Sequence, residues 1–153
     1  MISQVELEKI KEITNEFFDK ITFEVEVDFL PQKDLTIPIK VKTDSPQVLI
    51  GEGGRTLVEI QHLLKAMSRK KIKEDFYIDL DINGYKEKKI EYLKELAKSI
   101  AEDVYLSKKE RLLPPMPAYE RRVVHLELAD RIDVTTESID REPRRKVIVR
   151  PHP

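Results

Sequence analysis

The sequence of 153 residues contains no cysteine, which excludes disulfide bonds, thiolate nucleophiles and cysteine-based zinc sites. No apolar run approaches the roughly 18 residues that a membrane-spanning helix needs. The segment Met1–Glu8 lacks the basic and apolar regions of a signal peptide. The three histidines have no H-x-H or H-x-x-x-H spacing, and no Walker or dinucleotide motif occurs. We therefore expect a cytoplasmic protein in a reducing compartment, with no metal, no cofactor and no membrane contact.

Positive and negative charges almost balance, since 28 Lys and Arg against 29 Asp and Glu give a net charge of -1. This balance excludes binding of a polyanion by bulk charge alone. Residues 1–82 hold 12 basic and 16 acidic side chains, a net of -4, while residues 83–153 hold 16 and 13, a net of +3. Contact with a polyanion in the first part must therefore be local, whereas the second part can offer a basic face.

The spacing of apolar residues predicts an α+β chain, because helical and alternating patterns follow each other along the sequence. Pro38 lies on the opposite parity from the apolar residues of its strand, which favours an edge strand or a bulge. Ser45 before Pro46 is typical of a helix start with a capping side chain. The predicted elements are helix 3–20, strands 22–29 and 35–41, helix 46–50, helix 57–71, strand 76–82, helices 85–107 and 118–129, and strands 133–137 and 146–150.

Three of the four glycines lie in one loop, Gly51-Glu52-Gly53-Gly54, between two predicted helices. Glycines there let the backbone approach a sugar-phosphate chain, and the first amides of the next helix point at the anion. The alternative is that the glycines only make a tight turn between helices. A carboxylate at Glu52 repels a phosphate by about 1 kcal/mol or less, and Arg55 partly compensates. We therefore assign binding to the loop backbone rather than to its side chains.

The order helix, strand, strand, helix, Gly51-x-x-Gly54 loop, helix, strand resembles the type II KH domain over residues 1–82. The resemblance implies a three-stranded sheet with helices on one face. It also implies single-stranded nucleic acid held between the loop, its two helices and the third strand. Members of the family commonly carry a basic residue between the two glycines, and here Glu52 and Gly53 stand there. This departure motivates an alternative function, a protein–protein adaptor on a degenerate KH scaffold.

A second motif, Arg121-x-x-x-His125, places a guanidinium and an imidazole on one face of the predicted helix 118–129. Both groups can donate to phosphate oxygens. From the spacing alone, the alternative is a surface pair with a nearby carboxylate. Further along the chain, Arg144, Arg145 and Lys146 form a basic cluster, for which an ordinary solvated face is the alternative.

The second half carries several motifs in a fixed order and spacing, and together they resemble the R-three-H domain of the bacterial Jag (SpoIIIJ-associated, KhpB or EloR) family. The motifs are Asn83–Lys88, Pro115–Leu126, Val134–Ser138 and Pro143–Val149. The N-terminal Jag domain of many family members has no counterpart in this sequence. The resemblance implies a KH-like domain over 1–82 and a small α+β R-three-H-like domain over 83–153, joined through a long helix.

The resemblance further implies a single-stranded RNA-binding protein that acts as a post-transcriptional regulator rather than as an enzyme. Single-stranded DNA is a second expected ligand. The resemblance also implies a small single-KH protein as a partner, and it is compatible with homodimerisation. The family is tied to control of cell elongation. A hydrolase or nuclease would need a catalytic cluster, and Asp79 and Asp81 on one strand face have no base or nucleophile beside them. The expected RNA-binding residues are Gly51, Glu52, Gly53, Gly54, Arg55, Arg121, Arg122, His125, Arg144 and Arg145, with Ser138 in the strand region next to the helix.

Overall fold

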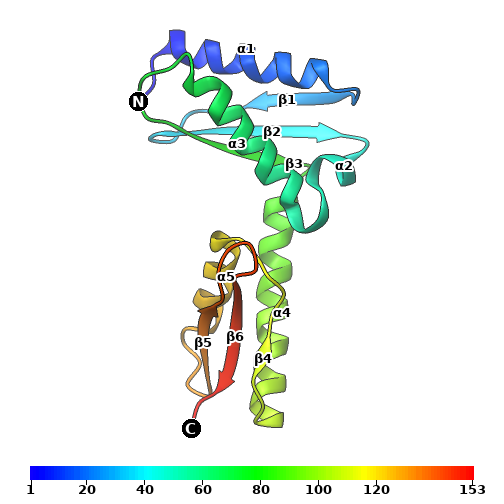
Figure 1. Cartoon of the computed structure of the whole chain (residues 1–153), viewed down its shortest axis with the longest axis vertical. Helices are drawn as coiled ribbons and strands as arrows, with labels where there is room; N and C mark the ends of the chain where they lie inside the picture. The colour runs from blue at the N-terminus through cyan, green and yellow to red at the C-terminus, as the bar shows by residue number, and fades with distance from the viewer. The chain divides into compact units, whose positions relative to one another are not determined.

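The computed structural model describes all residues from 1 to 153 and has an α+β fold. The chain forms two compact units, Met1–Lys86 and Glu87–Pro153. Each unit has its own sheet (Figure 1), which is three-stranded. Each unit also has its own hydrophobic core. None of the helices combines the length and the apolar character that crossing a bilayer requires.

The first unit has the element order of a type II KH domain, as the sequence predicts. Strand β2 is central, because it pairs antiparallel with β1 and parallel with β3. A 3₁₀ turn, η1, separates the two helices that flank the glycine loop. The elements are α1 (Gln4–Lys20), β1 (Val25–Phe29), β2 (Thr36–Thr43), α2 (Pro46–Ile50), η1 (Glu52–Gly54), α3 (Arg55–Arg69) and β3 (Tyr77–Ile82).

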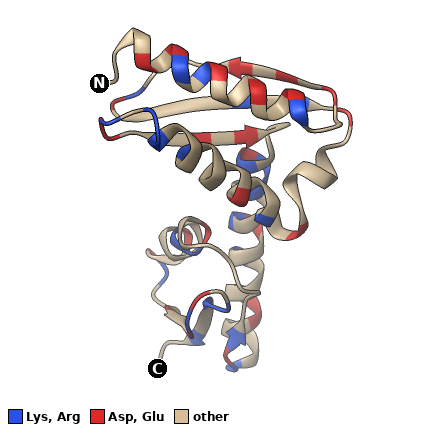
Figure 2. Cartoon of the chain, turned by 45° about the horizontal axis from the view of Figure 1, so that its top comes forward, with Lys and Arg blue, Asp and Glu red and all other residues tan.

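Helices α1 and α3 pack on one face of this sheet (Figures 1 and 2). Residues on that face of the strands, such as Ile37, Ile39 and Leu80, have no exposed surface, while Lys40 and Lys42 on the opposite parity are exposed. The predicted alternation of apolar and polar residues is therefore confirmed, because the side chains of a strand point alternately to the two faces of a sheet.

The prediction that Pro38 marks an edge strand or a bulge is wrong, since β2 is the central strand. The carbonyl of Pro38 accepts from the amide of Leu30, so the residue faces the β1 side of the strand. The last paired residue of β1 is Phe29, opposite Ile39. A backbone N–H at position 38 would face Leu30, one residue beyond the end of β1, so proline omits a single hydrogen bond at the end of that ladder.

Helix α1 begins with a capping box in which Ser3 and Glu6 satisfy each other's backbone amides. Within this helix Ile10 and Ile13 are buried, whereas Val5 is 68% exposed. Phe18 is buried instead. Val5 lies in the first turn of the helix. At α2, Ser45 is the N-cap residue as predicted, but its side chain makes no capping hydrogen bond.

The second unit contains most of the long helix that begins at Tyr85, followed by a small sheet with the order β4-β6-β5. Its core is formed by small and branched residues, among them Ala97, Ala101, Val124, Val147 and Val149. The predicted helices and strands are confirmed, and a two-residue strand, β4, is an addition too short to have an alternating pattern. The elements are α4 (Tyr85–Ser107), β4 (Arg111–Leu112), α5 (Ala118–Leu128), β5 (Val134–Ile139) and β6 (Lys146–Pro151).

Candidate nucleic-acid interface

Three of the four residues of the glycine loop have a backbone conformation that favours glycine. Gly51 has φ 74° and ψ 176°, a region essentially restricted to glycine. Gly53 and Gly54 are in the left-handed region, with φ values of 63° and 81°. The loop therefore has a defined shape that the sequence specifies by residue type.

The space around the three glycines differs sharply. A Cβ atom on Gly51 would lie 2.2 Å from Thr56 Oγ1, and one on Gly54 would lie 2.8 Å from Cε1 of Tyr85. A Cβ on Gly53 would meet nothing within 4 Å. The outer glycines thus permit close packing inside the unit, whereas Gly53 is open to solvent. Gly51 and Gly54 therefore fit the alternative in which the glycines only allow a tight turn. Gly53, by contrast, has an open, accessible backbone.

The residues between the outer glycines face solvent at the start of α3. Glu52, Gly53 and Arg55 are exposed, Gly51 is half-buried and Gly54 is buried. The first amide of α3, that of Arg55, already donates to the carbonyl of Glu52 in the 3₁₀ turn. The loop thus brings an exposed backbone, one carboxylate and one guanidinium together at the N-terminus of a 15-residue helix, where anions are electrostatically favoured.

Polar side chains cover the free edge of β3, on the same unit. The amide of Leu80 donates to Gln61 Oε1 on α3 at 3.0 Å. Lys86 Nζ donates to the same Gln61 oxygen at 2.9 Å and to Asp79 Oδ1 at 2.6 Å. Asp81 accepts from the amides of Ile82 and Lys86, at 2.9 and 3.0 Å. The two strand carboxylates are thus used to hold the strand edge and the first turn of α4, and they do not form a paired acid–base site.

On the second unit, Arg121 is turned into the protein. Its residue surface is only 8% exposed. Its Nη1 donates to the carbonyl of Met116 at 2.8 Å and to Oε1 of Glu142 at 3.0 Å. Its Nε is buried without a hydrogen-bond partner. The carboxylate pairing that spacing alone left open is therefore present for Arg121, while contact with phosphate stays a prediction.

His125 is held at both ring nitrogens by hydroxyl groups of β5. Nδ1 lies 2.8 Å from Thr136 Oγ1, and Nε2 lies 2.9 Å from Ser138 Oγ. Burial lowers the pKa of His125, and the positive charge of Arg121 lowers it further. The imidazole is therefore biased towards the neutral form, in which one ring nitrogen donates and the other accepts. The resemblance expected Ser138 in the strand region next to the helix, and this hydrogen bond links the two elements.

The remaining predicted cations of the second unit are more accessible. Arg122 and Arg144 are exposed, and Arg145 is half-buried, with Nη1 donating to the carbonyl of Asp140 at 3.3 Å. Arg144 lies in a turn closed by its amide donating to the carbonyl of Arg141 at 2.8 Å. Arg122 follows Arg121 on α5, whereas Arg144 and Arg145 lie on the loop before β6. These three residues supply accessible positive charge from two elements of one unit.

Next to Arg121 on α5, Glu120 is a buried carboxyl group. Only 2% of its surface is exposed. Burial raises the pKa of Glu120, and the charge of Lys89 on α4 and the hydroxyl of Tyr119 oppose this shift. The hydroxyl of Tyr119 donates to Glu120 Oε1 at 3.2 Å. The start of α5 therefore has a buried carboxyl group next to a nearly buried guanidinium. The sequence pattern did not indicate that either side chain is buried.

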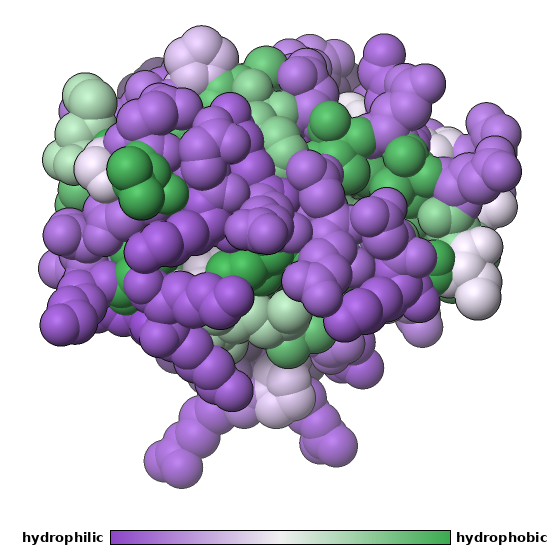
Figure 3. All heavy atoms as spheres, turned by 90° about the horizontal axis from the view of Figure 1, so that it is seen from above, coloured by the Kyte–Doolittle hydropathy of each residue, from purple (hydrophilic) through white to green (hydrophobic).

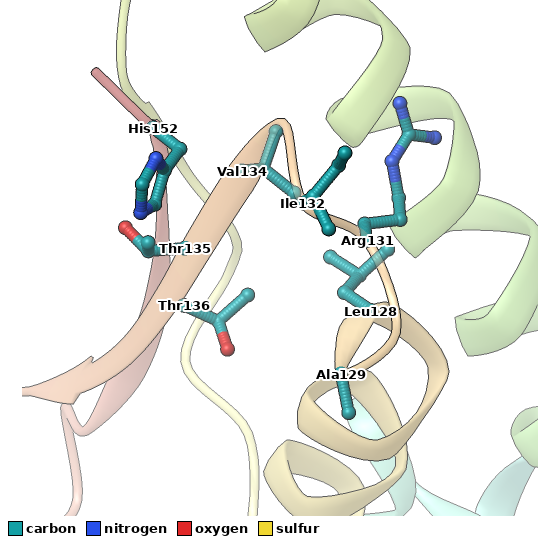
Figure 4. Close-up of a pocket in the computed structure, with 8 residues that line it drawn as sticks. All are labelled: Leu128, Ala129, Arg131, Ile132, Val134, Thr135, Thr136 and His152. Carbon is teal, nitrogen blue, oxygen red and sulfur yellow. The ribbon is translucent and has the colours of Figure 1, made fainter.

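An open pocket of about 470 Å³ lies at the other end of α5 (Figure 4). It is lined by Leu128, Ala129, Arg131, Ile132, Val134, Thr135, Thr136 and His152. Its one guanidinium, that of Arg131, is paired with Asp133 at 2.5 Å. The hydroxyl of Thr136 is engaged by His125. The lining thus offers no unpaired cation, and no group of three His, Asp or Glu side chains in the structure is placed to hold a metal ion.

Charge is not concentrated in one field on the first unit. Along α1, basic and acidic residues are interspersed (Figure 2). Seen from the end that carries α1, the surface is mainly hydrophilic, and hydrophobic side chains form separate patches (Figure 3). Any contact of this unit with a polyanion must therefore be local, and the glycine loop is the local feature that it offers.

Three residues at these sites were given no role by the sequence. Thr56 and Tyr85 pack against the outer glycines of the loop, and Glu142 pairs with Arg121. Thr56 lies two residues after Gly54, whereas Tyr85 is separated from the loop by helix α3 and strand β3. No sequence motif indicates that either residue contacts a glycine. Glu142 lies in a polar turn, where a carboxylate is ordinary.

Comparison with known proteins identifies a known domain within the second unit. The R-three-H domain model matches residues 91–151. The chain is 34% identical over 129 residues to a protein of Lactiplantibacillus plantarum named RNA-binding protein KhpB, and the match covers 84% of this chain and 39% of that protein. It is 32% identical over 143 residues to the protein of the same name from Clostridium symbiosum, covering 93% of this chain and 64% of that protein.

The chain is therefore homologous to the KhpB proteins of the Jag family. A third relative, the KhpB protein of Streptococcus pneumoniae, is 28% identical over 114 residues. The first match extends over most of both units, so the similarity is not limited to the R-three-H domain. The chain spans less than two thirds of the length of these relatives. The matches bear the names of RNA-binding proteins and of the R-three-H domain, and none bears the name of an enzyme.

Proposed function

We propose that this chain binds single-stranded RNA, with single-stranded DNA as a weaker ligand, and acts as a post-transcriptional regulator without catalytic activity. The KH-like part, residues 1–82, contributes the Gly51–Gly54 loop. The R-three-H-like part, residues 83–153, contributes cations of α5 and of the loop before β6. The observation that carries the proposal is the exposed, open backbone at Gly53 between two glycines that are fixed by packing.

The loop supports the proposal through its shape rather than its charge. Glu52 replaces the basic residue common in KH loops, so the side chains add repulsion and the backbone amides must supply the attraction. Arg55 at the start of α3 is the nearest cation in sequence. We therefore expect weak binding, in the micromolar range or above, with a shallow dependence on salt that corresponds to a few phosphate contacts.

The sharpest test of the loop replaces Gly53 by aspartate and, as a matched control, by asparagine. Both side chains tolerate a positive φ, and neither meets an atom within 4 Å of its Cβ. Gly53→Asp adds a carboxylate to the phosphate path, and we expect RNA affinity to fall about two- to fivefold at low salt. Gly53→Asn should bind like the parent chain. The readout is fluorescence anisotropy with a labelled, randomised single-stranded RNA and its DNA counterpart.

Gly54 is a poorer choice for this test, because any side chain there would collide with Tyr85. A loss of binding by a Gly54 variant would therefore mix a binding effect with a folding effect. If Gly53→Asp and Gly53→Asn bind RNA equally, the loop is not an RNA contact. Binding that persists would then be located in the second unit, where Arg122→Ala and Arg144→Ala report on two exposed cations.

The second candidate function is a protein–protein adaptor on a KH scaffold. It is favoured by the exposed Glu52 and by the net charge of -4 over residues 1–82. Absence of RNA binding by the parent chain at low salt, where phosphate contacts are strongest, would support this function and contradict the first.

The partner and assembly proposals have a separate test. We propose a small single-KH protein as a partner of the chain, with homodimerisation as the competing assembly. Sedimentation of the chain alone, and then with such a protein, distinguishes the two. A single monomeric species under both conditions would contradict both assemblies without affecting the RNA-binding proposal.

A further inference from the structure

The ion pair between Arg121 and Glu142 joins two side chains of very different accessibility. The side chain of Arg121 is 9% exposed, whereas that of Glu142 is 62% exposed, and the Nη1–Oε1 distance is 3.0 Å. The guanidinium is also fixed by its hydrogen bond to the carbonyl of Met116 at 2.8 Å. The carboxylate of Glu142, by contrast, lies mostly in solvent. The cation is therefore a fixed part of the fold, and the anion is the accessible partner.

The guanidinium also holds an unused donor. The Nε of Arg121 is buried and has no hydrogen-bond partner. A buried polar group without a partner is costly, and such groups in native structures call for an explanation. A guanidinium binds carboxylate and phosphate with the same planar fork of donors. Glu142 accepts from Nη1, which lies on a different edge of the guanidinium from Nε, so an external anion at this position would replace a single carboxylate contact.

Residues 140–146, around Glu142 in the sequence, hold four basic side chains and two acidic ones, Asp140 and Glu142. Glu142 lies in a turn between Arg141 and Arg144, both of which are exposed. The carboxylate of Asp140 is already paired with Lys146 at 3.2 Å. A polyanion that approaches this turn would be attracted by the two exposed arginines and repelled by Glu142. Glu142 is the group that stands between such a ligand and the guanidinium of Arg121.

We propose that Glu142 is an internal competitor that occupies the phosphate position of Arg121, so that a phosphate of single-stranded RNA must displace its carboxylate to bind. This inference rests on the proposed function and defines its regulation at the second unit. Displacement moves the exposed Glu142 side chain into water and leaves Arg121 in place. The pair therefore sets the affinity of this unit for RNA below the value that its cations alone would give.

The test removes the competitor and keeps its shape, by Glu142→Gln. The matched control is Glu137→Gln on β5, since Glu137 is 60% exposed and is paired with an arginine, Arg150, in the same unit. Both variants remove one negative charge, so a general effect of charge appears in both. We expect Glu142→Gln to bind RNA about two- to fivefold more tightly than Glu137→Gln, which is the range that an exposed ion pair covers.

Salt dependence provides a second expected result. If Arg121 gains a phosphate without a displaced carboxylate nearby, the plot of log affinity against log salt should be steeper for Glu142→Gln by up to about 0.7, the value for one phosphate of a single strand. The Nε–H signal of Arg121 in ¹⁵N NMR spectra gives a direct readout. Titration of Glu142→Gln with inorganic tripolyphosphate should shift this signal more than the same titration of the parent chain.

The outcomes are distinguishable. If the parent chain binds RNA and the two variants have equal affinities and slopes, the proposed competition is wrong and the RNA-binding function stands. If neither the parent nor the variants bind RNA, the proposed function fails. In that case, tripolyphosphate still decides the inference, because an unmoved Arg121 Nε–H signal in Glu142→Gln refutes an anion site, and a shift supports one.

Discussion

The contact between the glycine loop and the first residue of α4 makes a quantitative prediction. We compare Gly54→Ala with Gly53→Ala, which lie side by side in the loop with φ values of 81° and 63°. Both alanines must adopt the left-handed region, which costs about 1–2 kcal/mol. Part of this cost is returned, about 0.4–1 kcal/mol, because alanine restricts the unfolded chain. We expect Gly53→Ala to lower the free energy of unfolding of the first unit by about 1 kcal/mol.

Gly54→Ala carries an additional steric cost. Its Cβ would lie 2.8 Å from Cε1 of Tyr85, while carbon atoms in contact are about 3.5–4.0 Å apart. The ring must therefore withdraw by about 1 Å, and overpacking of this kind costs about 1–3 kcal/mol. The total for Gly54→Ala is thus about 2–4 kcal/mol, and the difference between the two alanine variants isolates the contact with Tyr85.

The assay is hydrogen exchange of the full chain, read at amides of β2 and β3. This choice assigns the loss to the first unit, since two compact units need not unfold in one transition. Urea denaturation followed by circular dichroism gives the overall change. In a Tyr85→Ala background, Gly54→Ala should cost no more than Gly53→Ala. Equal effects of the two alanine substitutions in the parent background would refute the contact.

Two further predictions concern pH. Because the pKa of folded His125 lies below the ordinary value of about 6.5, the unfolded state binds more protons below that pH. The contribution of His125 to stability should therefore be complete above about pH 6.5 and decline as the pH falls. Urea unfolding of the parent and of His125→Gln between about pH 7.5 and 5.5 checks this expectation. Parallel curves of unfolding free energy against pH would contradict it. Burial raises the pKa of Glu120. The contribution of this carboxyl group to stability is therefore present at a pH below the ordinary pKa of a carboxyl group, and it is lost as the pH rises. Glu120→Gln should therefore be more stable than the parent at about pH 7 and converge with it in acid, and a less stable variant at neutral pH would contradict the role of burial.

The local features of the fold were predictable because they depend on neighbouring residues. Helical spacing identified α4 with its ends at Tyr85 and Ser107, and alternation identified β3 up to Ile82. The glycine loop was evident from composition alone, since three of the four glycines lie there. The central place of β2 was not evident, because proline favours edge strands, and here Pro38 lies where it omits only one hydrogen bond at the end of the β1 ladder.

The sequence also identified the type of the candidate site but not the state of its side chains. It placed Arg121 and His125 on one helix, which follows from the 3.6-residue repeat. It could not indicate that the guanidinium is nearly buried against Glu142, twenty-one residues away, or that Thr136 and Ser138 hold both nitrogens of the imidazole. These contacts join elements that are brought together only by the packing of α5 on β5 and its neighbouring loop.

By itself, the sequence determined the order of helices and strands, the glycine loop and the family resemblance, because periodicity, turn chemistry and motif spacing are properties of adjacent residues. The tertiary structure alone decided which glycines are packed and which is open, since Thr56 and Tyr85 reach Gly51 and Gly54 through the fold. It likewise decided that Arg121 is a fixed cation with an exposed partner, because burial and ion pairing depend on which distant residues meet.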